Sequence, residues 1–477
     1  MDVATRIEKD SLGELAVPAA AYYGVHTARA MANFRVTGSA MSTYPALIAA
    51  LAMVKQAACQ ANRDLGLLDE RRSAAIIAAC TELRNGELLA QFPIDLIQGG
   101  AGTSSNMNAN EVIANRALEI LGFERGNYAE LDPLTHVNLG QSTNDVYPTA
   151  IKLSLVTHLR ALSVVLGGLA DEFDRKAAEF ADVIKMGRTQ LQDAVPMTLG
   201  QEFAAYATMV REDRTRLAEG CLLLLECHLG GTAIGTGING HPDYPELACR
   251  YLAELSGEPV VPAADPIEAT QDCGAFVQVS GILKRVAVKL SKICNDLRLV
   301  SSGPVAGLRE INLPAVQAGS SIMPGKVNPV IPELVNQVAF EVIGNDLTVT
   351  MAAEAGQLQL NAFEPVIAYS MLKSLSHLSA AVDTLTTDCI AGITANRQHL
   401  ADGVHNSIGV VTALAPRLGY KACAQVAERA LATGEMISDI VVSEGLLSRE
   451  EVSELLSSRR LAGLPPLVIH RTTDPVV

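Results

Sequence analysis

The sequence contains no tryptophan, and aromatic residues make up only 4% of its 477 positions. Strands of sandwiches and barrels are enriched in Tyr, Phe and Trp, whereas closely packed helices are readily built from Ala, Leu, Val and Ile. Hydrophobic residues still make up 49% of the chain, so a core can be supplied without aromatics. The scarcity of aromatic residues therefore favours a mainly helical protein.

Positive charge is also in short supply. The chain has 37 Lys and Arg against 52 Asp and Glu, which gives a formal net charge of −15. Nucleic-acid binding needs a basic face, so we expect no nucleic-acid partner. The deficit does not exclude an acidic small molecule as substrate, because a few local cations decide the charge of a pocket.

The nine cysteines form no recognisable framework, since they are odd in number and scattered from Cys59 to Cys423. The sequence has no CxxC pair and no Cys/His group with zinc spacing, so we expect no metal. The first residues, MDVATRIEKDS, lack the apolar run of a signal peptide, and no charge-free stretch is long enough to span a membrane. These features favour the reducing cytoplasm and no membrane partner.

Long helical patterns dominate the middle of the chain. No proline occurs between Pro148 and Pro196, and apolar residues there recur at helical spacing. This pattern predicts a helix that continues to about Lys185, longer than about 50 Å at 1.5 Å per residue. Similar patterns cover four further segments, which are residues 197–228, 269–302, 332–356 and 365–388.

Five long helices in succession predict an all-α bundle with smaller domains on either side. We expect an N-terminal mixed but mostly helical domain over residues 1–142, the bundle over 143–396 and a small helical domain over 397–477. Within the last, the sequence SREE at 448–451 is a capping box that opens a short helix. Helices of this length usually need a partner subunit to bury their apolar stripes.

Four polar clusters separate the helical patterns. They read GGAGTSSNMNANE (99–111), GQSTND (140–145), GRTQLQDAVPMTLGQE (187–202) and GSSIMPGKVNP (319–329). Hydroxyls, amides and one cation are the groups that bind carboxylates. Taken singly, each cluster also has a plain structural interpretation as a helix cap, a turn, a helix stop or a solvated linker.

The fourth cluster has the composition of a catalytic loop. Its prolines and glycines prevent a lasting helix or strand, while Ser320, Ser321, Lys326 and Asn328 supply two hydroxyls, a cation and an amide. The glycine-rich segment 230–240 has neither the lysine of a P-loop nor a GxGxxG pattern, so we do not expect nucleotide binding.

All four clusters, in this order, resemble the aspartase/fumarase superfamily, whose signature GSSxMPxKxN is matched without a departure. The resemblance runs from YYGVHT (22–27) to the C-terminal helices and implies that superfamily's fold. It is greatest to the aspartate ammonia-lyases. Class II fumarases carry a sequence similar to GRTHTQDA, in which His relays a proton, whereas this chain has Gln190 in GRTQLQDA. The segment GGAGTS at 99–104 also resembles the aspartate ammonia-lyases more than the fumarases.

The resemblance implies reversible deamination of L-aspartate to fumarate and ammonia through an aci-carboxylate. Ser320 is then the base that removes the C3 proton, and the loop N–H groups of Ile322 and Met323 help to hold the developing dianion. The β-carboxylate is expected to bind Thr103, Ser142, Thr143 and Ser321. The α-carboxylate is expected to bind Thr189, Lys326 and Asn328. The amino group is expected to contact Asn144, Thr103 and Gln190.

The same resemblance implies no cofactor, because the substrate's own carboxylate is the electron sink, and a homotetramer in which three subunits share each site. Two alternatives remain open. One is another lyase of the superfamily, such as a class II fumarate hydratase. The other is a non-catalytic helical scaffold, which the presence of both Ser320 and Lys326 disfavours.

Overall fold

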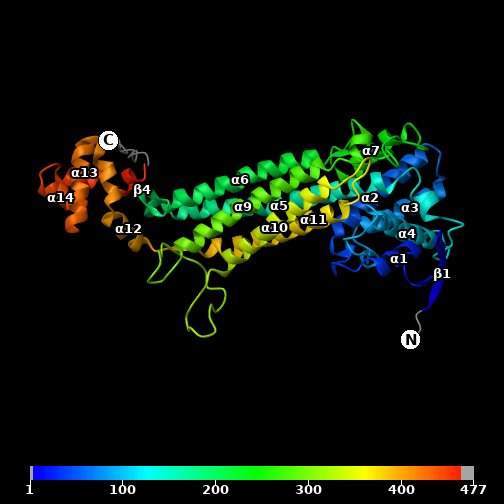
Figure 1. Ribbon diagram of the computed structural model, residues 1–477, viewed down its shortest axis with the longest axis horizontal. Helices are drawn as coiled ribbons and strands as arrows, with labels where there is room; N and C mark the ends of the chain where they lie inside the picture. Colours follow the sequence, from blue (N-terminus) through cyan, green and yellow to red (C-terminus); the bar gives the residue numbers. More distant parts are fainter. Residues whose placement is uncertain (1–3, 464–477) are drawn as a thin grey trace, which may run out of the picture. The chain divides into compact units, whose positions relative to one another are not determined.

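The computed structural model describes residues 4–463, and helices make up most of them (Figure 1). Strands occur only as four two-stranded sheets within that range. The predicted all-α class, with a bundle of long helices, is therefore confirmed. The chain forms two compact units, and five long helices contribute residues to both. The first unit is Met1–Val164, Asp213–Val288 and Gln337–Ala380, and the second is Val165–Glu212, Lys289–Asn336 and Ala381–Val477.

The predicted five long helices are all present. They are α5 (Thr143–Glu179), α6 (Leu199–Leu223), α9 (Gly274–Val300), α10 (Val330–Glu354) and α11 (Glu364–Asp388). Within the first unit, α9 contacts α10 where Ser280 donates to Asp346 at 2.8 Å. Within the second unit, α5 contacts α6 through the rings of Phe173 and Phe203. The division at 142 and 396 stays a prediction.

One predicted boundary is wrong. Helix α5 ends at Glu179 rather than near Lys185, because Lys185 belongs to β3 (Ile184–Thr189), which pairs antiparallel with β4 (Gln192–Thr198). The Lys185 side chain is buried and its ammonium lies 2.6 Å from the Glu310 carboxylate. A buried cation needs such a partner, which a position on an extended helix would not have supplied.

The first unit contains further short elements around the buried helix α2. The helices are α1 (Val25–Asn33), α2 (Pro45–Asp64), α3 (Glu70–Arg84), α4 (Thr103–Ile120), α7 (Tyr244–Ser256) and α8 (Pro266–Ala269), with short helical turns at Met41–Thr43, Leu89–Gln91 and Pro133–Val137. The strands are β1 (Thr5–Asp10) with β2 (Gly13–Pro18), antiparallel, and β5 (Glu226–Cys227) with β6 (Val261–Pro262), parallel. Helix α2 packs against α3 and α7.

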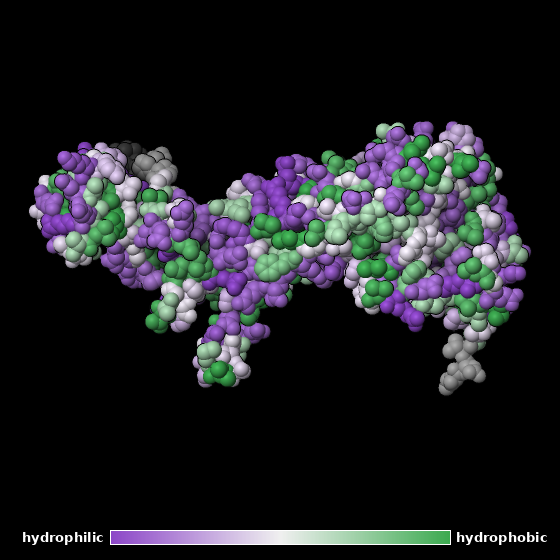
Figure 2. All heavy atoms as spheres, viewed as in Figure 1, coloured by the Kyte–Doolittle hydropathy of each residue, from purple (hydrophilic) through white to green (hydrophobic). Residues whose placement is uncertain are grey.

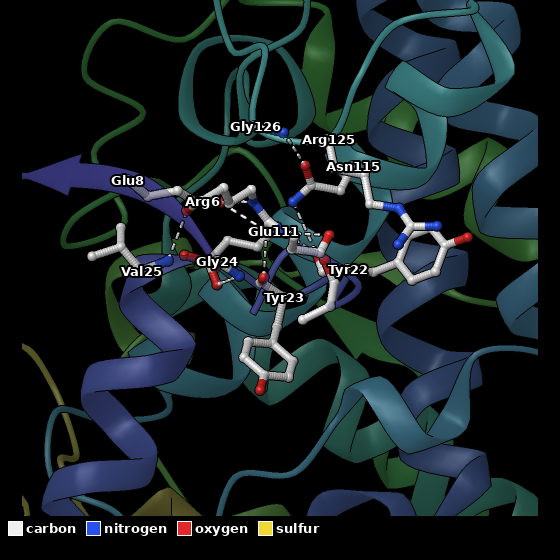
Figure 3. A network of polar contacts seen from close by, with 12 residues as sticks. Arg6, Glu8, Tyr22, Tyr23, Gly24, Val25, Glu111, Asn115, Arg125 and Gly126 are labelled. Carbon is white, nitrogen blue, oxygen red and sulfur yellow. Dashed lines mark hydrogen bonds and ion pairs between the residues drawn. The ribbon is translucent and has the colours of Figure 1, made fainter. Parts of the chain in front are cut away.

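A buried polar network joins the N-terminal hairpin to α1 and α4 (Figure 3). The Glu111 carboxylate of α4 accepts hydrogen bonds from the N–H groups of Gly24 and His26, both at 2.8 Å, and thereby caps α1. Glu8 of β1 accepts from the N–H of Val25 at 2.8 Å. A Cβ at Gly24 would lie 2.5 Å from the Glu8 carboxylate and 2.9 Å from the Glu111 carboxylate, so a side chain there would displace both acids from these hydrogen bonds.

The second unit ends in short helices with their own core. The elements are β7 (Ile311–Asn312) with β8 (Thr394–Ala395), α12 (Arg397–Asn406), α13 (Ala415–Thr433), α14 (Ile437–Ser443), α15 (Arg449–Leu455) and α16 (Ser458–Leu461), with helical turns at Ile390–Gly392 and Ile408–Leu414. Val404, Leu414 and Ile440 are fully buried there, and Ile184 and Met186 of β3 join the same cluster. The predicted capping box at Ser448 and Glu451 is confirmed.

Several apolar side chains reach the surface along the long helices (Figure 2). On α10, Phe340, Leu347 and Met351 are each more than 60% exposed and follow one another at helical spacing. Helix α5 is long and apolar enough to cross a membrane by length and composition, but 56% of its apolar window is buried inside the protein. Such burial is typical of a core helix.

Candidate active site

The first polar cluster forms the N-terminus of α4. Thr103 is its first helical residue and is exposed. The preceding Gly102 has φ +85°, and a Cβ there would lie 2.1 Å from the ring of Tyr147, so this turn requires glycine. Tyr147 on α5 thus supports the turn that presents Thr103. Asn106 follows one turn later and lies on the same face of α4.

The second cluster forms the N-terminus of α5. The Ser142 hydroxyl oxygen accepts the N–H of Asn144 at 3.2 Å, and the Asp145 carboxylate accepts the N–H of Ser142 at 3.1 Å. These bonds cap the helix, so the structural interpretation of STND as a cap is correct. Burial raises the pKa of Asp145 to about 7. The capping is compatible with a binding role, because Ser142, Thr143 and Asn144 stay partly exposed.

His228 completes this turn in a way that the sequence did not reveal. Pro148 lies inside α5 and has no N–H, which leaves the carbonyl of Asn144 without its helical donor. The His228 ring nitrogen Nε2 occupies that position, 2.8 Å from the Asn144 oxygen. Burial lowers the pKa of His228 to about 4, so the ring is neutral and donates through Nε2–H. The Asn144 side chain donates to the Ala233 carbonyl at 2.8 Å.

A buried lysine and a group of amides lie behind the second cluster. The Lys55 ammonium of α2 donates to the side-chain oxygens of Asn138 and Gln141 at 2.8 and 2.9 Å. The Asn106 amide donates to Asn138 and to the Thr143 hydroxyl oxygen, both at 3.1 Å. Sequence reasoning missed Lys55 and Asn138. The only available signal was the unusual number of asparagines in the predicted helix at 106–115, namely Asn106, Asn108, Asn110 and Asn115, all of which the structure buries.

The third cluster is a β-hairpin rather than a helix stop. Thr189 ends β3, and Gln190 and Leu191 form the turn with φ of +54° and +63°. Such turns favour Asn-Gly, because larger residues are strained in the left-handed region. Thr189 and Gln190 are exposed at this tip. Strain held at an exposed tip is typical of a functional loop.

The fourth cluster is a loop, as its composition predicts, between β7 and α10 (Figure 1). The Ser320 hydroxyl oxygen accepts the N–H groups of Ile322 at 3.2 Å and Met323 at 2.9 Å. Asn328 donates to the Gly319 carbonyl at 2.7 Å, which closes the base of the loop. A Cβ at Gly319 would meet the Lys326 carbonyl at 2.6 Å, so glycine is required for this closure.

The second unit also contains a buried acid, Glu310, and a cavity beside the serine loop. Glu310, just before β7, pairs with Lys185 and Arg188 of the hairpin strand, which fixes the start of the serine loop segment to β3. A cavity of about 570 Å³ borders the base of the loop. Its lining includes three cations, Arg298, Arg309 and Lys326, and one acid, Glu333, so positive charge is in excess. The loop base is therefore a suitable place for an anion.

The predicted site residues fall into two sets. Thr103, Ser142, Thr143 and Asn144 belong to the first unit, where α4 and α5 bring their helix starts together through Asn106 and Thr143. The remaining predicted residues, Thr189, Gln190, Ser320, Ser321, Ile322, Met323, Lys326 and Asn328, belong to the second unit. Within the described residues, no group of three or more His, Cys, Asp or Glu side chains could hold a metal ion. Each set offers neutral donors, and the second adds the lysine cation.

Comparison with known proteins places these features in a family. The chain matches the Lyase family over residues 13–344 and the fumarase C C-terminus family over residues 410–463. It is 59% identical over 452 residues to an aspartate ammonia-lyase of Pseudomonas fluorescens, covering 94% of this chain and 95% of that protein. It is 55% identical to an aspartate ammonia-lyase of Helicobacter pylori, covering 96% and 97%.

Solved structures agree with this result. A fumarate lyase/delta crystallin from Brucella melitensis bound to cobalt has a TM-score of 0.94 at 55% identity, covering 96% of this chain and 100% of that one. A class II fumarase from Schistosoma mansoni has a TM-score of 0.90 at 34% identity, covering 96% and 99%. The fold and the polar loops define a helical lyase. The chain belongs to the aspartase/fumarase superfamily of lyases.

Proposed function

We propose that this chain catalyses the reversible deamination of L-aspartate to fumarate and ammonia. The observation that carries the proposal is the identity of 54–59% to aspartate ammonia-lyases over nearly the full length, together with the intact serine loop. Gln190 argues against the hydratase alternative, since a carboxamide cannot relay a proton as an imidazole does. The enzyme is a carbon–nitrogen lyase.

The chemistry begins with a weakly acidic proton. The Ser320 oxygen removes it from C3, and the electron pair moves into the β-carboxylate to give a doubly charged aci-carboxylate. Collapse of this dianion forms the C2–C3 double bond and expels the amino group from C2. A serine oxygen is a base only when it is ionised or nearly so, and the two N–H groups that reach Ser320 stabilise its negative charge.

Stabilisation of the dianion is the largest expected contribution to the rate. We assign the β-carboxylate to the hydroxyls of Thr103, Ser142, Thr143 and Ser321. We assign the α-carboxylate to Thr189, Lys326 and Asn328, and the amino group to Asn144, Thr103 and Gln190. Ile322 and Met323 donate to Ser320 in the present conformation. Their help to the substrate dianion would therefore need the loop to rearrange when substrate binds. We assign no general acid to the leaving nitrogen, which departs as ammonia or ammonium.

We further propose a homotetramer in which three subunits share each site. The family resemblance implies this assembly, and one feature of the structure supports it: Phe340, Leu347 and Met351 leave α10 with an exposed apolar face that a second copy of the chain would cover. No cofactor takes part in this mechanism. The nine cysteines are all free and buried, which supports a cytoplasmic location.

The test is the appearance of fumarate. Purified protein is mixed with L-aspartate and the absorbance of the new double bond is followed, with ammonia measured in parallel. The same protein is then given L-malate. Fumarate and ammonia in equal amounts from aspartate support the proposal. Fumarate from malate alone would assign the chain to the hydratases, and inactivity on both would favour a scaffold role.

A further inference from the structure

Asn138 has only one possible orientation in the network behind Thr143. Its side-chain NH2 donates to the main-chain carbonyl of Gln141 at 3.0 Å, and a carbonyl can only accept. Its side-chain oxygen receives the Lys55 ammonium at 2.8 Å, and an ammonium can only donate. Burial lowers the pKa of Lys55 to about 7, but a neutral amine still has one N–H for Asn138 and one for Gln141. Both contacts fix Asn138 with its oxygen toward α4.

The orientation of the Asn138 amide determines the orientation of the Asn106 amide that faces it. Because the Asn138 oxygen accepts, the group of Asn106 that faces it at 3.1 Å must be the NH2. The same NH2 lies 3.1 Å from the Thr143 hydroxyl oxygen, which must therefore accept. Because the Thr143 oxygen accepts from Asn106, the Thr143 hydroxyl proton must point away from Asn106. Within the described residues that proton has no acceptor, and Thr143 is partly exposed, so the proton can be donated to a bound ligand.

Folding alone does not explain why an asparagine stands at this position. Asn106 is 2% exposed, and its side-chain oxygen has no hydrogen-bond partner within the described residues. A buried acceptor without a partner opposes folding, and the side-chain oxygens of Asn108 and Asn110 on α4 share this property within the described residues. Asn106 differs from them because its NH2 donates to the Thr143 hydroxyl, and a leucine of similar size would fill the space but could not orient Thr143.

We propose that Asn106 is a positioning residue that makes the Thr143 hydroxyl a hydrogen-bond donor to the substrate carboxylate, with its own orientation set by Lys55 through Asn138. The inference rests on the proposed function, in which Thr143 contacts the β-carboxylate. That carboxylate gains negative charge in the transition state, so a donor aimed at it in advance lowers the barrier. Lys55 acts at a distance and does not touch the substrate.

The test reverses the direction of one hydrogen bond. Burial raises the pKa of a carboxyl, so Asn106→Asp is assayed at about pH 9, where the carboxylate is ionised and can only accept. It then takes the Thr143 proton away from the substrate. We expect kcat/KM for L-aspartate to fall by about 100-fold, the loss typical of one missing oxyanion donor. Asn106→Leu removes the donor but leaves the hydroxyl free to turn toward the substrate, so we expect a loss of only about fivefold.

A double-mutant cycle identifies Thr143 as the intermediary. In the Thr143→Val background, which has no hydroxyl, Asn106→Asp should lower kcat/KM by less than about threefold, because the two changes disable the same donor. The control is Asn108→Asp, since Asn108 is also buried on α4 but donates to the Gln91 carbonyl at 2.9 Å. Its effect should be the same with and without the Thr143 hydroxyl.

The possible outcomes separate the two proposals. A wild-type protein that releases no fumarate overturns the proposed function and this inference with it. An active wild type overturns the inference alone if Asp and Leu at position 106 cost the same, or if the cycle with Thr143→Val is additive. Thermal melts report whether Asn106→Asp folds. If it does not, Asn106→Leu takes its place in the cycle, and a loss that persists without the Thr143 hydroxyl overturns the inference.

Discussion

The backbone N–H of Met323 donates a 2.9 Å hydrogen bond to the hydroxyl oxygen of Ser320. Donors on this oxygen favour its ionised form, so the loop lowers the cost of using a serine as a base. The loop around it is largely exposed, with Ile322 at 83% and Met323 at 48%. Ser320 therefore does little packing, and its removal should affect chemistry far more than stability.

We predict that Ser320→Ala lowers kcat for L-aspartate by at least about 1,000-fold, as the loss of a catalytic base together with its bound donors should. The melting temperature should change by no more than a degree or two. Ser443→Ala is the control, because it removes a serine hydroxyl outside the predicted site, one that donates locally to the main-chain carbonyl of Ile440. Retention of a tenth of wild-type kcat in Ser320→Ala would move the role of base to another group, with Ser321 tested next.

Lys326 should contribute mainly to substrate binding. We predict that Lys326→Met raises KM for L-aspartate strongly and lowers kcat as well, with a total loss of about 2 kcal/mol or more in kcat/KM, because the α-carboxylate is left without its cation. Lys421→Met on α13 removes an exposed ammonium from the same protein and should leave both constants unchanged. An unaltered KM in Lys326→Met would place this lysine outside the pocket.

The long helices and the serine loop were predictable because each depends on local sequence. Apolar spacing, with proline only near the helix start, defined α5, α9, α10 and α11, and the prolines and glycines of 319–329 excluded regular structure. The β3–β4 hairpin was missed, since its strand sequences show no clean alternation of apolar and polar residues and its turn is Gln190–Leu191 rather than Asn-Gly. The error at Lys185 arose because a buried ion pair with Glu310, far along the chain, decides its environment.

The support of the candidate site could not be predicted in the same way. Lys55 lies on a helix that looks like any apolar core helix, and its partner Asn138 comes 83 positions later. Only the tertiary fold brings α2 beside the segment 138–141 that precedes α5. The role of His228 likewise depends on the tertiary fold. Its ring donates to the Asn144 carbonyl in place of the missing N–H of Pro148, and this need can be recognised only when the start of α5 is known. Contacts of this kind depend on the tertiary fold and leave no periodic signal.

Glu364 gives a prediction about pH. This acid, at the first position of α11, is 5% exposed, and burial raises its pKa to about 8. The folded protein holds this proton more tightly than the unfolded chain does. The free energy of unfolding therefore falls as pH rises from the pKa of the unfolded chain to about 8, and it does not fall further on this account above pH 8. Glu364→Gln should therefore match the wild type near pH 4 and become more stable as pH rises through 8, by up to about 5 kcal/mol.

Thermal melts of both proteins between pH 4 and pH 9 provide the measurement. The difference in melting temperature should grow with pH and level off above pH 8. Glu354→Gln is the control, since Glu354 is exposed near the end of α10. Its difference from the wild type should stay constant across the range. A constant difference for Glu364→Gln as well would mean that the buried carboxyl is not the source of the pH dependence.

Sharing of sites between subunits predicts complementation. Ser320→Ala and Thr189→Val should each be nearly inactive as a homotetramer, since each lacks one part of every site. When the two are mixed, partly unfolded and reassembled, a hybrid tetramer can contain a site that takes its intact Ser320 from one chain and its intact Thr189 from another. Such sites need no new contact, so they should regain the activity of a wild-type site.

The recovered activity should rise with the fraction of hybrids, and native mass analysis of tetramers with distinguishable subunit masses gives that fraction. Reassembling each variant by itself controls for gain of activity from refolding alone. Reassembly of Ser320→Ala with the double variant Ser320→Ala/Thr189→Val should stay inactive, because no chain then supplies Ser320. Hybrids that form and remain inactive would mean that both residues of a site come from the same chain, which would contradict the shared-site proposal.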